Sequence, residues 1–143
     1  MKHVLFLFAL ALAATSTQAQ TEAPIIDKKQ HKIVIHLTSN DTLVHKAVVK
    51  QIGHILEAAP NSKVEVVCHS NGIGFLLISE TKQAAKIADL KNKGVAFVAC
   101  ENTMRERKIK REELVPQSGT VPSGVMEVVK KQEKGWAYLR AGL

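Results

Sequence analysis

Apolar and polar residues follow two different periods along the chain, and the shorter period predicts strands. Short segments rich in valine, isoleucine and leucine are bounded by polar or turn-forming residues, a pattern typical of strands. These segments are residues 32–37, 63–69, 95–99, 119–121 and 136–139. The last two are brief.

Longer segments repeat apolar residues every three or four positions, which is the period of an amphipathic helix. In residues 42–59 the apolar positions share one helical face: Val44, Val48, Ile52, Ile55 and Ala59. Ser39, Asn40 and Asp41 supply N-cap chemistry before this helix, and Ser123 does so before a later one that Gly135 closes. Further helices are predicted at residues 73–78, 80–92 and 102–110, with an extra turn at 112–115.

Strands that alternate with helices predict an α/β fold with a mainly parallel open sheet, because parallel strands need crossover connections. Many doubly wound sheets place the first strand between the second and the third. We therefore expect residues 32–37 to separate Cys68 from Cys100, a distance too long for a disulfide. Two free thiols are expected, with Cys68 buried and Cys100 the more reactive.

The N-terminal segment predicts export. Residues 1–19 have a cation at Lys2, an apolar run and small residues before a cut after Ala19, the layout of a secretory signal peptide. The apolar run is too short to span a bilayer, so no stable membrane insertion is expected after cleavage. We divide the rest into a flexible leader at 20–30 and a single domain at 31–143, and expect a periplasmic protein.

The charge and the aromatic content of the chain argue against nucleic acid as a partner. The formal net charge is +7, and the densest basic run is residues 105–111 (RERKIKR). Aromatic residues make up only 4% of the chain, whereas many nucleic-acid-binding modules combine a basic face with aromatic platforms. Nucleic acid is therefore not expected as a partner, and the basic run is interpreted as a solvated helical face.

Cys100 stands where the third predicted strand meets the following helix. Backbone N–H groups at the start of a helix favour thiolate over thiol, and Arg105 could add positive charge. Three interpretations stay open here: a buried core residue, half of a disulfide with Cys68, or a nucleophile. The two cysteines form no CxxC pair, and the histidines lack metal-binding spacing, so neither a metal nor a cofactor is expected.

Three segments together resemble the DsrE/DsrF-like family of small sulfur-metabolism proteins: VEVVCHSNGIGFLL, KNKGVAFVACENTMRERKI and TVPSGVMEVVKKQEKGWAYLRAG. The resemblance covers about residues 31–141. It implies a three-layer, flavodoxin-like α/β sandwich in one domain, and association into trimers or larger rings. In some members a cysteine that corresponds to Cys100 carries sulfur as a persulfide. The family tends to show His-Gly where this chain has His69 and Ser70.

Two function classes follow. In the first, Cys100 accepts a sulfane sulfur from a donor and passes it to an acceptor thiol, as a sulfur carrier or sulfurtransferase. Asn102 and Thr103 would hold the outer sulfur, and His69 would move a proton. The remaining binding candidates are Arg105, Asn71 and Gly72. In the second class the protein is a non-enzymatic oligomer whose strand-end crevice binds a small molecule or a partner, and Cys100 only lines that crevice. In either class we expect a homo-oligomer, a trimer or a multiple of it.

Overall fold

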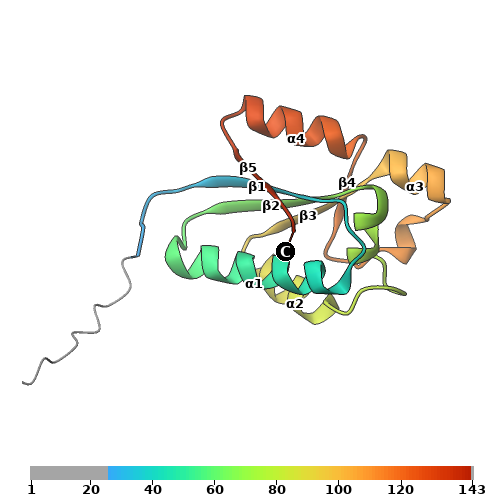
Figure 1. Ribbon diagram of the computed structural model, residues 1–143, viewed down its shortest axis with the longest axis horizontal. Helices are drawn as coiled ribbons and strands as arrows, with labels where there is room; N and C mark the ends of the chain where they lie inside the picture. The colour runs from blue at the N-terminus through green and yellow to red at the C-terminus, as the bar shows by residue number, and fades with distance from the viewer. Residues whose placement is uncertain (1–25, 143) are drawn as a thin grey trace, which may run out of the picture.

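Five parallel strands form one sheet in the computed structural model, which describes residues 26–142 (Figure 1). The strand order is β4-β3-β2-β1-β5, and these strands pair in parallel. The strands are β1 Lys32–Leu37, β2 Lys63–Cys68, β3 Ala96–Cys100, β4 Gly119–Val121 and β5 Ala137–Arg140. The predicted α/β fold with a mainly parallel open sheet is confirmed.

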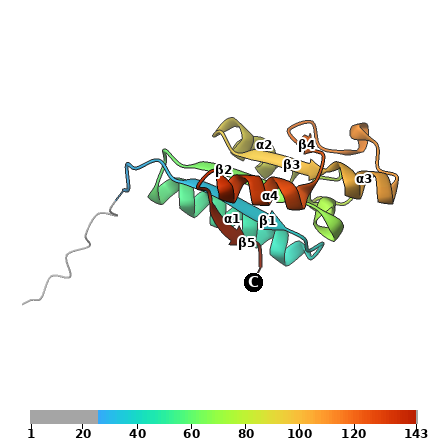
Figure 2. The ribbon, with the colours of Figure 1, turned by 90° about the horizontal axis from the view of Figure 1, so that it is seen from above.

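Helices cover both faces of the sheet, which gives three layers (Figures 1 and 2). Helices α1 (Thr42–Ala58) and α2 (Ala84–Asn92) cover one side, called here the α1/α2 face. Helix α4 (Gly124–Glu133) covers the opposite side, called the α4 face. Helix α3 (Glu101–Arg107) continues directly from β3. Two 3₁₀ helices complete the described elements: η1 Ser70–Phe75 and η2 Arg111–Glu113.

Helix α1 begins and packs as its sequence predicts. The Asp41 carboxylate accepts a hydrogen bond of 2.8 Å from the Leu43 N–H, which satisfies one free donor of the first turn. Val44, Val48 and Ile52 are buried along one face of the helix. The face with helical spacing is therefore the face that packs on the sheet.

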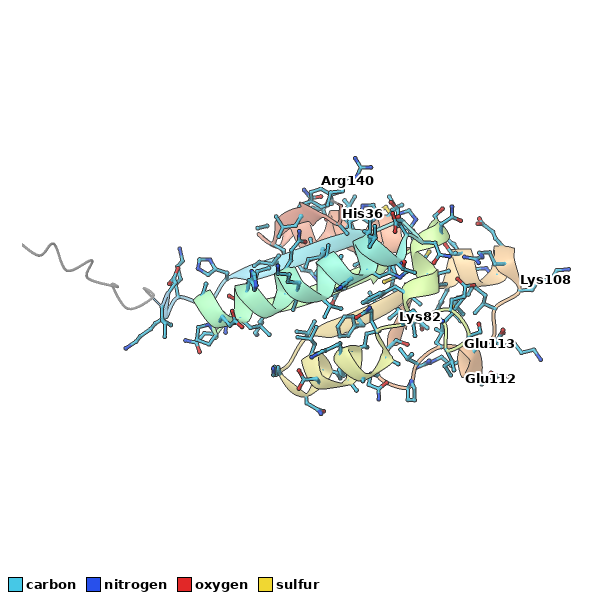
Figure 3. The ribbon with its side chains drawn as sticks, turned by 60° about the horizontal axis from the view of Figure 1, so that its bottom comes forward. His36, Lys82, Lys108, Glu112, Glu113 and Arg140 are labelled. Carbon is cyan, nitrogen blue, oxygen red and sulfur yellow. The ribbon has the colours of Figure 1, made fainter. Side chains whose placement is uncertain are left out.

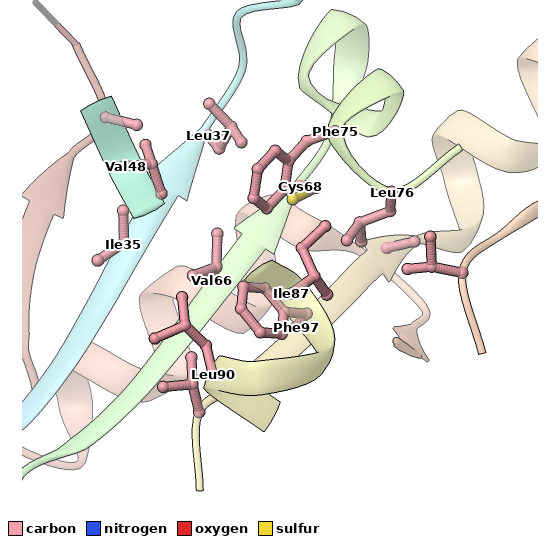
Figure 4. Packing of buried hydrophobic residues seen from close by; sticks show 14 of the residues in the cluster. Ile35, Leu37, Val48, Val66, Cys68, Phe75, Leu76, Ile87, Leu90 and Phe97 are labelled. Atoms are coloured by element: carbon pink, nitrogen blue, oxygen red, sulfur yellow. The ribbon is translucent and has the colours of Figure 1, made fainter. Parts of the chain in front are cut away.

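The α1/α2 face holds most of the hydrophobic core (Figure 4). The rings of Phe75 and Phe97 lie 6.1 Å apart, and both side chains are almost completely buried. Ile87 of α2 and Val66 of β2 pack in the same cluster, and Cys68 is a member of it. Cys68 thus serves as a small core residue among large apolar ones.

The α4 face has a much smaller apolar cluster, formed by Val34, Val67 and Val128. Next to it, the Lys131 ammonium lies 2.6 Å from a carboxylate oxygen of Glu65 and 4.2 Å from the centre of the Trp136 ring. Burial raises the pKa of Glu65, and the hydrogen bond and charge of Lys131 oppose that rise. A partly buried ion pair on β2 therefore helps to hold α4 on the sheet.

The expected position of the first strand is wrong. β2 pairs directly with β3, with Cys68 opposite Ala99, and β1 lies on the far side of β2. Both early crossover helices, α1 and α2, pack on the same face, so the chain advances in one direction from β1 to β4. Only α4, on the opposite face, brings the chain back to place β5 beside β1.

Three helix boundaries also differ from prediction, and one of them is the end of α3, which lies at Arg107 rather than at residue 110. Helix α2 begins at Ala84 rather than at residue 80, because the Thr81 hydroxyl accepts the Gln83 N–H in a local turn. The turn after β2 is the 3₁₀ helix at Ser70–Phe75 rather than a helix at 73–78. A Cβ on Gly72 would lie 2.1 Å from the Leu37 carbonyl oxygen, so this turn needs a glycine to pack on the end of β1.

The predicted signal peptide at 1–19 lies outside the described residues, as does the first part of the leader. Where the leader is described, it is hydrogen-bonded to the main body. The Asp27 N–H donates to the Ala58 carbonyl at 2.8 Å, and the Asn61 amide donates to the Lys28 carbonyl at 2.8 Å. Within residues 26–142, no helix has the length and apolarity to cross a membrane.

Candidate functional site

Cys100 ends β3 and is the N-cap residue of α3. Since Cys68 pairs with Ala99, and side chains alternate along a strand, Cys100 faces the α4 layer while Cys68 faces α1 and α2. Both cysteines are free. The expected free thiols are therefore present, but opposite side-chain directions keep them apart, not an intervening strand.

Several hydrogen-bond donors converge on the Cys100 sulfur. Burial alone would raise the pKa of this thiol, since the residue is only 4% exposed. The backbone N–H groups of Gly124, Thr103 and Asn102 and the Thr103 hydroxyl donate to the sulfur, and together they lower its pKa below the ordinary value. The donors come from the first turns of two helices, α3 and α4, and helix N-termini favour negative charge.

Gly124 allows α4 to approach this closely. A Cβ at this position would lie 3.0 Å from the Cβ of His69 and 3.2 Å from the Cβ of Cys100. Ser123 caps the helix, because its hydroxyl accepts the Met126 N–H at 3.4 Å. Gly124, the residue after the cap, thus lies close to the side chains of both His69 and Cys100, and only glycine fits there.

Thr103 connects the cysteine to the turn after β2. Its side chain is 5% exposed, and its hydroxyl oxygen accepts the Ser70 N–H at 3.0 Å. Ser70 has a φ of 54°, in the left-handed region that glycine adopts at the lowest cost. The glycine that the resembling family tends to have after the histidine would relieve that strain.

His69 and His36 form a stacked pair on the α4 face, with ring centres 4.5 Å apart. The Nδ1 atom of His36 lies 3.2 Å from the Tyr138 hydroxyl. Burial lowers the pKa of both histidines, and for His36 the charges of His69 and Arg140 lower it further. Figure 3 shows His36 and Arg140 close together at this side of the molecule. Both imidazoles are therefore neutral near pH 7.

The Nε2 atoms of His36 and His69 are buried, and neither has a hydrogen-bond partner among residues 26–142. A buried polar atom without a partner marks a place where a ligand or a transferred proton can be accommodated. His69 also lies beside Gly124, as Cys100 does. His69 is therefore the member of the pair that lies next to the cysteine.

The other predicted site residues divide into two groups. Asn102 and Thr103 hydrogen-bond to the Cys100 sulfur itself, and their predicted role of holding an outer sulfur stays a prediction. Arg105 instead donates to the side-chain oxygen of Asn102 on the exposed side of α3. Asn71 is exposed, and Gly72 packs against the end of β1.

Sequence reasoning missed Gly124, His36 and Tyr138. Gly124 has a local signal, a glycine directly after a serine N-cap, but the signal does not say which side chains it approaches. His36 and Tyr138 meet only because β5 pairs with β1, a contact between opposite ends of the chain. In the described part of the chain, no group of three or more His, Cys, Asp or Glu side chains could hold a metal ion.

Comparisons with known proteins agree with this fold. The model of the DsrE/DsrF-like family matches residues 5–141 of the chain. Among solved structures, a protein of unknown function, MTH1491, from Methanobacterium thermoautotrophicum is similar with a TM-score of 0.73 and 27% sequence identity. The alignment covers 77% of this chain and 98% of that one. No curated protein matches the sequence.

Proposed function

The chain belongs to the DsrE/DsrF-like family, and on that premise we propose that it carries sulfur as a persulfide on Cys100. One observation carries the proposal. The Cys100 sulfur accepts hydrogen bonds from three backbone N–H groups and one hydroxyl, and these lower the pKa of a nearly buried thiol. A thiolate is the nucleophilic form of cysteine, so this environment suits covalent storage of a sulfur atom.

The proposed reaction is a transfer of sulfane sulfur. The Cys100 thiolate attacks the outer sulfur of a donor persulfide. A new S–S bond forms on Cys100 while the donor S–S bond breaks, and the bonding electron pair leaves with the donor thiolate. An acceptor thiolate then attacks the outer sulfur on Cys100 and regenerates the Cys100 thiolate. Neither step needs an external oxidant or reductant.

The surrounding residues support this reaction in distinct ways. The amides of Asn102, Thr103 and Gly124 stabilise negative charge on the sulfur before attack and after release. His69 is neutral near pH 7 and has a buried, unpartnered Nε2, so it can accept the proton of an incoming thiol. Cys68 takes no part, because burial on the opposite face raises its pKa far above the ordinary value.

Intact mass spectrometry after incubation with a polysulfide tests the proposal. We expect mass gains in steps of one sulfur atom, abolished by Cys100→Ser and retained in Cys68→Ala, the matched control on the neighbouring strand. A gain that persists in Cys100→Ser would contradict the role of Cys100. No gain in the wild-type protein would favour a non-enzymatic binding protein in which Cys100 only lines a crevice.

We also propose a homo-oligomer, a trimer or a multiple of it. Large apolar side chains are exposed on α4 and β5: Val125 54%, Met126 48%, Val129 37%, Tyr138 40% and Leu139 44%. Tyr138 and Leu139 face opposite sides of the sheet, and contacts between identical chains would remove these exposed side chains from water. Light scattering at micromolar concentrations should give a mass of several chains, and a monomer throughout that range would refute the assembly.

Export is the last part of the proposal and rests on the sequence of residues 1–19. Sulfur would then be transferred in the periplasm, with a donor and an acceptor thiol in that compartment. N-terminal sequencing of protein from its host should begin at Gln20. Protein that begins at Met1 and remains in a membrane fraction would rule out cleavage.

A further inference from the structure

The sequence predicts that the basic run at residues 105–111 is a solvated helical face. In the structure the run does not form a single helical face. Helix α3 ends at Arg107, and Lys108 adopts a left-handed conformation with φ 56° and ψ 35°. The Ile109 N–H then returns to the Met104 carbonyl at 2.8 Å. This ending is typical of a helix that closes with a left-handed residue, and it turns the chain back beside α3.

The turn borders an open groove of about 570 Å³. Four cations line it: Arg105, Lys108, Lys110 and Arg111. Met104 and Ile109 also line the groove and pack against the hydrophobic core, so they supply an apolar part. Figure 3 shows Lys108 at the far end of α3, directed outward.

Uncharged partners hold the two guanidinium groups of the groove. Arg105 donates to the side-chain oxygen of Asn102, and Arg111 donates to the carbonyl of Ser118, a residue that is only 5% exposed. Because these acceptors carry no charge, they orient the arginines without neutralising them. Oriented guanidinium groups suit bidentate binding of carboxylate, phosphate or sulfonate.

Nearby carboxylates balance the positive charge only in part. Among the ion pairs of residues 26–142, none involves a cation that lines the groove, and Glu80 pairs with Arg107 instead. Glu101 is the carboxylate within the groove lining, and it accepts a hydrogen bond from the Thr120 hydroxyl. Glu112 and Glu113 line a different groove, with Ile78. The site therefore has an excess of positive charge.

We propose that this groove binds a small organic anion, with a phosphate, sulfonate or carboxylate group on an apolar body. The cations would hold the anionic group, and Met104 and Ile109 would contact the body. The site is separate from the thiol. Thr120 pairs with Ala99 and so belongs to the α1/α2 face, whereas Cys100 belongs to the α4 face. The proposal thus goes beyond sulfur transfer and does not depend on it.

Amide chemical shifts of the folded protein, titrated with phenyl phosphate, test the site. We expect saturable shifts at the groove residues, and no such shifts with benzyl alcohol, which has a similar body without the charge. The double variant Arg105→Gln/Lys110→Gln should lower the affinity for phenyl phosphate at least about tenfold, because each substitution removes a charge-assisted hydrogen bond. Arg111 is left unchanged because its contact with Ser118 supports the loop.

A matched control separates a built site from general attraction to a basic protein. Lys46→Gln/Lys50→Gln removes the same charge from a second groove, between α1 and α2, and should leave the affinity unchanged. Equal weakening by both double variants, or shifts that never saturate, would overturn the proposal. Cys100→Ser should still bind phenyl phosphate, and loss of binding in that variant would disprove a separate site.

Discussion

Cys68 and Cys100 end neighbouring strands of one sheet, yet they have opposite surroundings. Cys68 lies on the α1/α2 face, fully buried among large apolar side chains, and burial raises its pKa. Cys100 lies on the α4 face, where amide and hydroxyl donors lower its pKa although it is only 4% exposed. The two thiols thus differ both in the cost of burial and in the hydrogen-bond donors around the sulfur, and both differences favour the thiolate at Cys100.

The two faces divide stability and chemistry between them. The α1/α2 face contains the large apolar cluster, whereas the α4 face combines three buried valines with ionisable side chains: Glu65, His36, His69 and Cys100. Because side chains alternate along each strand, one short sequence supplies both faces. Mutations on the α1/α2 face should therefore mainly lower stability, whereas mutations on the α4 face should mainly change the reactivity of Cys100.

The largest expected effect is on stability and belongs to the α1/α2 face. Phe97→Ala removes a side chain that is 1% exposed and should cost about 3–5 kcal/mol of the free energy of unfolding. Val128→Ala on the α4 face should cost about 1–2 kcal/mol, because it removes less apolar volume from a smaller cluster. Urea unfolding at one fixed protein concentration measures both, and equal losses would erase the contrast between the faces.

The next effect is on reactivity and belongs to the α4 face. Gly124→Ala places a methyl group against His69 and Cys100, so the start of α4 must move away and its N–H must leave the sulfur. Alkylation of Cys100 by a small reagent at pH 7 should slow about tenfold, the effect of one lost hydrogen bond to a charged group. The strain should also cost about 1–3 kcal/mol.

Gly53→Ala is the control for that change. A Cβ at Gly53 of α1 meets no atom within 4 Å, so alanine should stabilise the helix by up to about 1 kcal/mol and leave alkylation unchanged. If both alanine variants slowed alkylation alike, contact between Gly124 and Cys100 would not be the cause.

A pH effect separates the faces further. The pKa values of His36 and His69 are lowered in the folded protein, mainly by burial, so below about pH 6.5 the unfolded chain binds more protons. Stability should therefore be constant above that pH with respect to these groups, and should fall as the pH drops through it. Urea midpoints between pH 8 and pH 5 measure the fall. His36→Asn should reduce it, and an unchanged fall would exclude the pair as its source.

The sequence predicts the elements of this fold well but not their neighbours. Strand β1 and the start of α1 agree with prediction because β-branched residues, periodicity and the Asp41 cap are local signals. The strand order depends on which face each crossover helix covers. The apolar positions of α1 and α2 do not show which face of the sheet each helix covers, so the predicted position of the first strand was wrong.

The residues of the candidate site show the same difference between local signals, which the sequence contains, and long-range contacts, which it does not. Cys100 can be proposed from the sequence alone because a strand end and a helix start adjoin it. Asn102 and Thr103 follow from the same local feature. Gly124 comes from a helix that returns over the opposite face, and no local pattern links it to Cys100. Residues that reach a site through long-range pairing need the fold before they can be assigned.

The smallest expected effect tests whether the strain at Ser70 serves stability or chemistry. Ser70 has a φ of 54°, and its N–H binds the Thr103 hydroxyl that also contacts Cys100. Ser70→Gly keeps that N–H and removes the strain of a left-handed side chain, against the entropy cost of glycine in the unfolded chain. The net gain in the free energy of unfolding should be about 0.5–1 kcal/mol, measured by urea unfolding.

Lys108→Gly is the control, with a φ of 56° at the far end of α3, and it should give a similar gain in stability. Alkylation of Cys100 should be unchanged in both variants. If Ser70→Gly alone slowed alkylation, the strained turn would be part of the thiolate site, and the division between a stabilising face and a reactive face would extend to the backbone.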